Sequence, residues 1–153
     1  MGAKNKILVS VSTLGFIGHL PFAPGTFGTL ASLVFLAVLK PPLPLHSAMI
    51  IVVTTIGVYS SSSAERLSGI KDPGHIVIDE FAGYMVSMLF LPFNYGYITA
   101  SFILFRIFDI IKPPPIKGVE HALKGGLGIM ADDIVAGIYA NIAIQAWRYL
   151  ILS

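Results

Sequence analysis

Long apolar segments separated by short polar links dominate the chain. They occupy residues 27–39, 46–61, 81–93, 95–111 and 134–152. A membrane-spanning helix needs roughly 17–25 residues, and three of these segments approach that length. The segments 27–39 and 81–93 are shorter, although a helix from Ile76 to Phe93 would be long enough. The pattern predicts an all-α, multi-helical membrane bundle of roughly four to five hydrophobic helices, with the stretch 7–20 in the membrane interface or re-entering.

Helix-breaking residues separate these segments. The sequence Lys-Pro-Pro-Leu-Pro (40–44) predicts a turn, and residues 91–96 predict a tight connection between two helices. Three prolines at 113–115 end the preceding helix, because proline lacks a backbone N–H and clashes with the turn before it. Glycines at 125–128 predict a flexible approach to the last helix. No linker or change of composition interrupts the chain, so we expect a single domain over residues 1–153.

The composition favours lipid as the solvent for much of the surface. The chain is 55% hydrophobic and only 12% charged, whereas about 25% is usual in a globular protein. A net charge of +2, without a basic stripe, argues against nucleic acid as a partner. The absence of cysteine excludes disulfides, thiolate metal sites and cysteine nucleophiles. Lys4 and Lys6 precede an apolar stretch as in a signal peptide, but Pro-Phe-Ala-Pro (21–24) is a poor cleavage site, so we expect this stretch in the mature protein.

Hydrophobicity alone also predicts an orientation. With the loop before residue 27 in the cytoplasm, the segments cross in alternation, and every acidic residue falls on the cytoplasmic side. Only Lys40 and Arg148 fall on the far side, while eight basic residues remain inside, in agreement with the positive-inside rule. These eight are Lys4, Lys6, Arg66, Lys71, Arg106, Lys112, Lys117 and Lys124. We therefore expect a multi-pass protein whose polar site faces the cytoplasm.

Two acidic pairs, Asp79-Glu80 and Asp132-Asp133, are the strongest chemical feature. We expect both pairs to start helices, where carboxylates also favour the positive end of the helix dipole, so helix capping is the simpler explanation. Adjacent residues project about 100° apart on a helix, so one acid of each pair can face the interior. Gly83 and Gly137 follow one turn later and permit close helix approach. Converging carboxylates select Mg²⁺, Mn²⁺ or Ca²⁺, and Mg²⁺ is the natural choice where phosphate is also a ligand.

A second motif, Phe-Arg-Ile-Phe-Asp-Ile-Ile-Lys-Pro, occupies residues 105–113. Arg106 and Asp109 share a helix face at i and i+3, which is compatible with a simple ion pair. The functional alternative makes Asp109 a metal ligand and Arg106 a phosphate ligand, since a guanidinium binds phosphate through two hydrogen bonds. Lys112 would then serve either the helix dipole or the phosphate.

The third motif is Ala-Pro-Gly-Thr-Phe-Gly-Thr at 23–29. Its turn could offer Gly25, Thr26 and Gly28 to an anion through backbone N–H groups. Alternatively, Thr26 or Thr29 caps a helix. His19 and His75 lie beside motifs on the same side and could transfer protons, although a single histidine is more often structural.

Together, these motifs resemble the phosphatidylglycerophosphatase A family. The matching stretches are 24–28, 72–83, 105–116 and 125–137, in the order and spacing of the family. The resemblance implies an all-α bacterial lipid phosphatase of the inner (cytoplasmic) membrane. It implies that Mg²⁺ assists removal of the terminal phosphate of the phospholipid phosphatidylglycerophosphate, which gives phosphatidylglycerol. It also makes Asp72 a candidate, whereas His19, His75 and Lys124 lie where the family varies.

The resulting hypothesis assigns a role to each residue. Carboxylates hold one or two Mg²⁺ ions, with Asp109 as a further ligand or as a base that orients water, and basic groups and helix amides hold phosphate. The metal ligands are Asp79, Glu80, Asp132, Asp133 and Asp109; the phosphate ligands are Arg106, Lys112, Gly25, Thr26 and Gly28. Attack by water and a phospho-aspartyl intermediate both remain open, as does the oligomeric state.

Three other classes of protein fit part of the pattern. A small transporter or ion-binding subunit could use the same carboxylates, but it would place them near mid-membrane. An alcohol phosphotransferase acting on CDP-lipids would carry a longer Asp-rich motif on one helix. A structural membrane subunit would use the acids as helix caps only.

Overall fold

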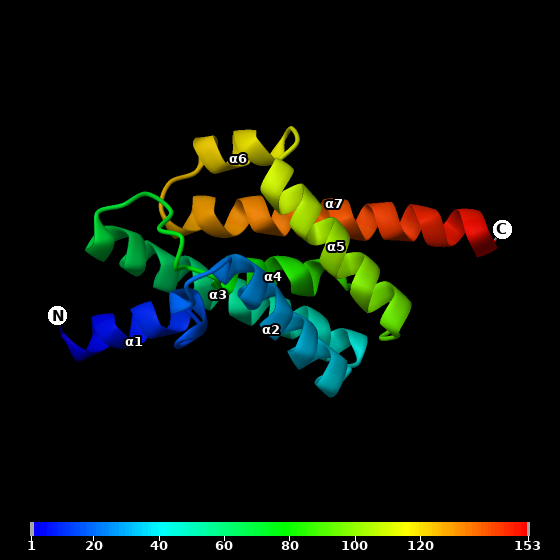
Figure 1. The fold of residues 1–153 in the computed structure, drawn as a ribbon, viewed down its shortest axis with the longest axis horizontal. Coiled ribbons are helices and arrows are strands. Elements are labelled where there is room, and N and C mark those ends of the chain that lie inside the picture. Colours follow the sequence, from blue (N-terminus) through cyan, green and yellow to red (C-terminus); the bar gives the residue numbers. More distant parts are fainter. Residues whose placement is uncertain (1, 153) are drawn as a thin grey trace.

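The computed structural model describes residues 2–152, and only the backbone of residues 120, 121, 151 and 152. Within the described residues, all regular secondary structure is helical, which confirms the predicted all-α class (Figure 1). Its elements are α1 (Ala3–Ser12), the 3-10 helix η1 (Ile17–His19), α2 (Pro24–Leu39), α3 (Leu43–Ser68), α4 (Ile78–Ser87), α5 (Tyr95–Ile111), α6 (Ile116–Ala122) and α7 (Gly126–Leu152).

The five apolar segments correspond to α2, α3, α4, α5 and α7. The predicted turn after Lys40 and the stop before Pro113 are both present, and Lys40 and Lys112 end their helices in the left-handed conformation. The stretch 7–20 forms α1 and η1, and the link after the prolines contains the short helix α6. The glycines at 125–128 are not a flexible approach, since α7 begins at Gly126.

The length expected for α4 is wrong. A helix from Ile76 to Phe93 could span a membrane, but α4 has only 10 residues. Before it, the Val77 N–H donates to the Ser12 carbonyl (2.9 Å) rather than to a helical partner. After it, the Asn141 amide donates to the carbonyls of Ser87 (3.0 Å) and Leu89 (2.7 Å). These tertiary contacts replace helical hydrogen bonds at both ends, so α4 stays short.

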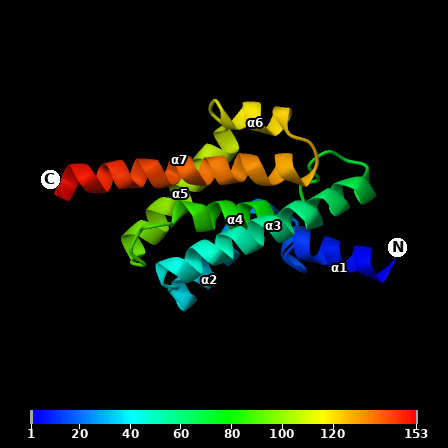
Figure 2. The same ribbon diagram turned by 180° about the vertical axis from the view of Figure 1, so that it is seen from behind.

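Helix α4 lies at the centre of the molecule. In Figures 1 and 2, α2 and α5 cross it on one side while α3 covers it on the other, and all three helices and α7 contact it. Side chains of two of these neighbours bond to its backbone: Ser32 Oγ donates to the Phe81 carbonyl (2.8 Å), and His46 Nε2 to that of Met85 (3.0 Å). The Tyr84 hydroxyl of α4 donates to the Ile98 carbonyl of α5 (3.0 Å). These hydrogen bonds anchor α4 to α2, α3 and α5.

Helices α4 and α7 pack against each other almost without intervening side chains. A Cβ atom built on Gly83 would lie 2.6 Å from the Asp133 carbonyl oxygen, and one on Gly137 would collide with the Gly83 carbonyl. Both glycines are therefore required for this contact, as their position one turn after each acidic pair predicts. The contact brings the acidic pair in the first turn of α4 next to the acidic pair inside α7.

Two of the described helices, α3 and α7, are long and apolar enough to cross a membrane. These two helices stand out by length and composition only, and the core helix of a soluble protein can share both properties. Half of the apolar stretch of α7 is buried inside the fold, but only 17% of the apolar stretch of α3 is buried. The apolar surface of α3 is therefore the stronger indication of contact with lipid.

Candidate active site

Four helices contribute to one polar cluster: the first turn of α2, the first turn of α4, the C-terminal half of α5 and the N-terminal part of α7. Asp79 and Glu80 lie in the first turn of α4, as predicted. Asp132 and Asp133 do not start a helix, because α7 begins at Gly126, almost two turns earlier. Helix capping therefore does not explain the second pair.

One acid from α7 joins both acids of α4. Carboxylate oxygens of Asp79, Glu80 and Asp133 lie within 4.8 Å of one another. Asp79 and Asp133 are almost fully buried, with 7% and 3% of their surfaces exposed, and Glu80 is half-buried. Within the described part of the chain, Asp79 Oδ1, Glu80 Oε2 and Asp133 Oδ2 are buried without a hydrogen-bond partner. Buried acceptors without partners are costly, so this arrangement suits a bound cation.

Burial and mutual repulsion dominate the electrostatics of the α4 pair. Burial raises the pKa of Asp79 well above its usual range, and the neighbouring Glu80 charge raises it further. Burial also raises the pKa of Glu80, although a hydrogen bond with Asp79 and, more weakly, the nearby Arg106 oppose this rise. Without a cation these groups would hold protons that solvent-exposed carboxylates lose. A divalent ion would stabilise their ionised forms, and their hard oxygen atoms fit such an ion.

The other two acids of the predicted ligand set contact basic side chains. Asp109 Oδ2 lies 2.6 Å from Arg106 Nη1, and Asp132 Oδ2 lies 2.6 Å from Lys112 Nζ. The Asp132 carboxylate also accepts a hydrogen bond from the backbone N–H of Asp133 (3.0 Å). Both ion pairs lie beside the cluster of Asp79, Glu80 and Asp133. Asp109 and Asp132 do not belong to that three-residue cluster. That they bind a metal ion therefore stays a prediction.

Arg106 connects the acidic cluster to the start of α2. Its Nη1 atom lies 3.7 Å from Glu80 Oε1 and 3.5 Å from Thr29 Oγ1. Its Nε atom is buried and has no partner among the described residues. A guanidinium with a spare buried donor, next to a metal-binding cluster, is suited to hold an anion. The side chain of Thr29, a residue that the sequence suggested as a helix cap, therefore lies beside the site.

The first turn of α2 fits closely against this cluster. A Cβ atom on Gly25 would collide with Glu80 Oε1 and lie 3.3 Å from Arg106 Nη1. A Cβ atom on Gly28 would lie 2.8 Å from Val77 instead. The helix begins at Pro24, so the prediction that Thr26 or Thr29 is its N-cap is wrong. Thr29 Oγ1 instead donates to the Gly25 carbonyl (2.9 Å) within the helix.

The remaining candidates lie around this centre. His19 and His75 stack with ring centroids 5.8 Å apart. Burial and the nearby His19 lower the pKa of His75. Asp72 adopts a positive φ of 47° in the loop before α4, and its charge contributes to the raised pKa of Asp79. Lys124 is exposed in the link between α6 and α7.

Comparison with known proteins agrees with this arrangement. The model of the phosphatidylglycerophosphatase A family matches residues 10–148. A phosphatidylglycerophosphatase A from Escherichia coli is 40% identical over 143 residues, which cover 89% of this chain and 83% of the relative. One from Haemophilus influenzae is 38% identical over 133 residues, covering 85% and 82% of the two chains.

A further relative carries a different name. A protein from Bacteroides thetaiotaomicron named "Putative phosphatidylinositol-3-phosphatase" is 40% identical over 143 residues, or 88% of this chain and 89% of the relative. No solved structure matches the chain. The family match covers nearly the whole sequence and every motif of the site. The chain belongs to the phosphatidylglycerophosphatase A family.

Proposed function

We propose that this chain, as one domain over residues 1–153, is a Mg²⁺-dependent lipid phosphatase. It hydrolyses the terminal phosphate monoester of phosphatidylglycerophosphate and releases phosphatidylglycerol. One observation carries the proposal: three carboxylates from α4 and α7 converge beside Arg106, each with a buried oxygen that has no described partner. Family membership supports the reaction, because two of the relatives carry the name of this activity.

The three converging acids are the core of the proposed metal site. Asp79, Glu80 and Asp133 would hold the ion through one oxygen each, and Mg²⁺ fits because it prefers carboxylates together with phosphate oxygens. A bound Mg²⁺ ion would neutralise phosphate charge and lower the pKa of a bound water molecule. Uncatalysed hydrolysis of phosphate monoesters is among the slowest known reactions, so this charge stabilisation must be large.

Basic side chains would position the phosphate. Arg106 would use its buried, unpartnered Nε and its Nη1 on phosphate oxygens, while Asp109 fixes the guanidinium plane through the 2.6 Å ion pair. Lys112 would provide a second cation, oriented by Asp132. The close packing of Gly25 against Glu80 and Arg106 would bring the first turn of α2, with Thr26 and Gly28, close to the same phosphate. The Thr26 N–H already donates to the Ala23 carbonyl (2.9 Å), so Gly25 would offer its N–H to the phosphate there.

The two paired acids also have proposed roles. Asp109 is a further metal ligand or orients the attacking water, and Asp132 completes the ligand set together with Asp133. In direct hydrolysis the water oxygen bonds to phosphorus, the phosphorus–glycerol oxygen bond breaks, and the glycerol oxygen takes a proton. A phospho-aspartyl route would differ by a covalent intermediate, which rapid-quench trapping of labelled protein would detect.

An apolar groove offers a place for an acyl chain of the substrate. It has a volume of about 700 Å³ and is lined by residues of α2 and of the η1 segment. Phe35, which lines it, packs against Phe81, the residue that follows Glu80. We propose that the lipid lies along α2 with its head group at the start of this helix. The site would then face the cytoplasm at the edge of the inner membrane.

A related substrate is the second candidate. The Bacteroides relative is named after phosphatidylinositol 3-phosphate, which is also a phosphate monoester on a lipid head group. The proposed site would recognise a phosphate monoester through Arg106 and the metal ion, and both lipids carry such a phosphate. Side-by-side kcat/KM values on the two substrates would distinguish the candidates.

Phosphate release from phosphatidylglycerophosphate is the decisive test. We expect activity that EDTA abolishes and that added Mg²⁺ restores. Asp79→Asn and Asp133→Asn should each lower kcat by roughly 100-fold or more, since each removes a charged ligand. Glu65→Gln is the matched control, because Glu65 lies on α3 outside the cluster. Full activity in both cluster variants, or in EDTA, would overturn the proposal.

A further inference from the structure

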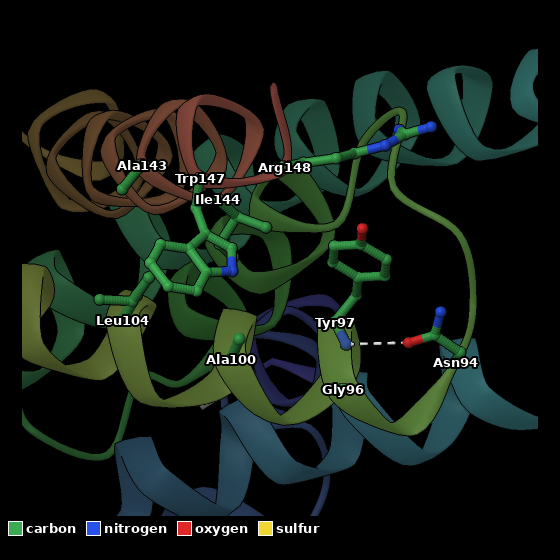
Figure 3. A pocket seen from close by; sticks show the side chains of 9 residues that line it. All are labelled: Asn94, Gly96, Tyr97, Ala100, Leu104, Ala143, Ile144, Trp147 and Arg148. Carbon is green, nitrogen blue, oxygen red and sulfur yellow. Dashed lines mark hydrogen bonds between the residues drawn. The ribbon is translucent and has the colours of Figure 1, made fainter. Parts of the chain in front are cut away.

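A second pocket lies between α5 and α7, away from the acidic cluster (Figure 3). Its volume is about 580 Å³, within the range of small-molecule sites in proteins. Its lining residues come from positions 94–104, at and after the start of α5, and from positions 143–148 of α7. They include Asn94, Tyr97, Ala100, Leu104, Trp147 and Arg148. Fifteen helical residues separate Asp133 from Arg148, or about 22 Å. The proposed function makes no use of this pocket.

Its walls are apolar and its polar groups are few. Figure 3 shows the Trp147 ring turned towards α5, near Ala100 and Leu104, while Arg148 extends from α7 past Tyr97. The Asn94 side chain is not free to bind a ligand through its oxygen, since that atom caps α5 by accepting from the Tyr97 N–H (3.1 Å). Among the described residues that line the pocket, Arg148 is the one that carries a charge.

Arg148 has no anionic partner within the described part of the chain. The eight acidic residues all lie between Glu65 and Asp133, and none of the ion pairs found involves Arg148. The same side chain also lines a neighbouring hollow of about 380 Å³ together with His46 and Phe93. A half-buried guanidinium between two apolar hollows attracts an anion that carries an apolar body.

The surrounding surface is suited to a lipid interface. Trp147 and Tyr149 are 64% and 74% exposed at the end of α7, and Tyr95 is 91% exposed at the start of α5. Aromatic rings with polar tips gather where membrane helices meet the head groups, and α7 is one of the two helices long enough to span. A soluble anion would leave the apolar walls exposed to water, whereas a lipid would cover them.

We propose that the pocket between α5 and α7 binds an anionic phospholipid, with an acyl chain between the two helices and the phosphate on Arg148. This site is separate from the acidic cluster and does not depend on the phosphatase proposal. Its preference for anionic over zwitterionic lipid should be about fivefold, as expected for one basic residue at a membrane surface.

Trp147 provides the test, because it is the only tryptophan in the chain. The full chain is placed in phosphatidylcholine nanodiscs that contain a small, equal fraction of either phosphatidylglycerol or phosphatidylcholine with brominated acyl chains. Bromine quenches tryptophan fluorescence at short range. We expect brominated phosphatidylglycerol to quench Trp147 more strongly at every fraction, with binding about fivefold tighter.

Variants assign that preference to the pocket. Arg148→Gln should make quenching by the two brominated lipids equal. Ala100→Phe, which fills the pocket, should weaken quenching by both lipids. Arg66→Gln, a change of the same type at the other end of the molecule, should retain the preference. Asp79→Asn should retain it as well, which separates this site from the active site.

Two results would overturn the proposal: equal quenching by both lipids in the unchanged protein, or an unchanged preference in Arg148→Gln. If Arg148→Gln does not fold, as circular dichroism would show, Arg148→Lys keeps the charge and should keep the preference. High salt applied to the unchanged protein provides a second measurement. It should reduce the preference for the anionic lipid, and a preference that salt leaves intact would also count against the proposal.

Discussion

At the scale of single residues, crowding of carboxylates determines how the site responds to metal and pH. Asp79 is buried beside Glu80, so its pKa is raised and the folded chain binds its proton more tightly than the unfolded chain does. Above the unfolded pKa of about 3.9, the unfolded state loses this proton first. The contribution of Asp79 to stability is therefore greatest in acid and decreases as the pH rises.

The first prediction concerns this pH dependence. In EDTA, the melting temperature should fall as the pH rises from about 4 towards neutrality, and Asp79→Asn should make the fall smaller. Addition of Mg²⁺ at neutral pH should raise the melting temperature of the unchanged protein but not of Asp79→Asn. Scanning calorimetry with and without EDTA measures both effects. Equal pH profiles for the two proteins would contradict this account of the cluster.

Two glycines of α2 give a second prediction, because the same substitution should have different effects at each. In Gly25→Ala the new methyl group meets the flexible end of Glu80, which can move aside at the expense of the site. In Gly28→Ala it meets Val77, including its backbone carbonyl, which cannot move. Gly25→Ala should therefore lower activity about tenfold with little loss of stability, whereas Gly28→Ala should destabilise the fold by roughly 1–3 kcal/mol.

Gly118→Ala is the control for both, since a Cβ atom on Gly118 meets nothing within 4 Å. Phosphate release and denaturant unfolding, measured on all three variants, separate the two effects. A Gly25→Ala variant that loses stability as strongly as Gly28→Ala would show that Glu80 is held rigidly rather than free to rotate.

At the scale of elements, the contact between α4 and α7 assembles the metal cluster. The third prediction is that Gly137→Ala pushes α7 away from the Gly83 carbonyl and carries Asp133 with it. We expect a loss of roughly 1–3 kcal/mol of stability and a smaller increase of the melting temperature with Mg²⁺. Gly118→Ala serves again as the control. An unchanged response to Mg²⁺ would mean that Asp133 is not a ligand.

At the scale of the whole molecule, the exposed apolar surface must be covered. Ile51 and Val52 of α3 are 67% and 53% exposed, on a helix long enough to span. The fourth prediction is that the protein stays in the membrane pellet after carbonate extraction. Ile51→Lys should release it or lead to its degradation, since a charge at the centre of a span costs about 2.5–3.5 kcal/mol.

Ile70→Lys is the matched control, because Ile70 is 61% exposed but lies in the link after α3. Its extraction should not differ from that of the unchanged protein. If Ile51→Lys behaves like Ile70→Lys, α3 does not insert as a span. The number of spans would then have to be smaller than the apolar pattern predicts.

Much of the secondary structure could be predicted from sequence because its signals are local. Apolar runs locate the five main helices, and Pro113 and the prolines after Lys40 end helices by removing N–H donors. The ends of α4 could not be predicted. They depend on the Asn141 amide and the Ser12 carbonyl, which lie 54 and 65 residues from their partners.

The sequence by itself determined which chemistry is available: acidic pairs, an Arg-x-x-Asp motif and two glycines that let helices meet. Only the tertiary structure decided which of the five predicted acidic metal ligands form the cluster and which pair with basic side chains. Because neighbouring residues point about 100° apart, the rotation of α7 directs Asp133 into the cluster and Asp132 towards Lys112. That rotation follows from the packing of α7 on α4, which depends on the shape of both helices and therefore cannot be read from either segment alone.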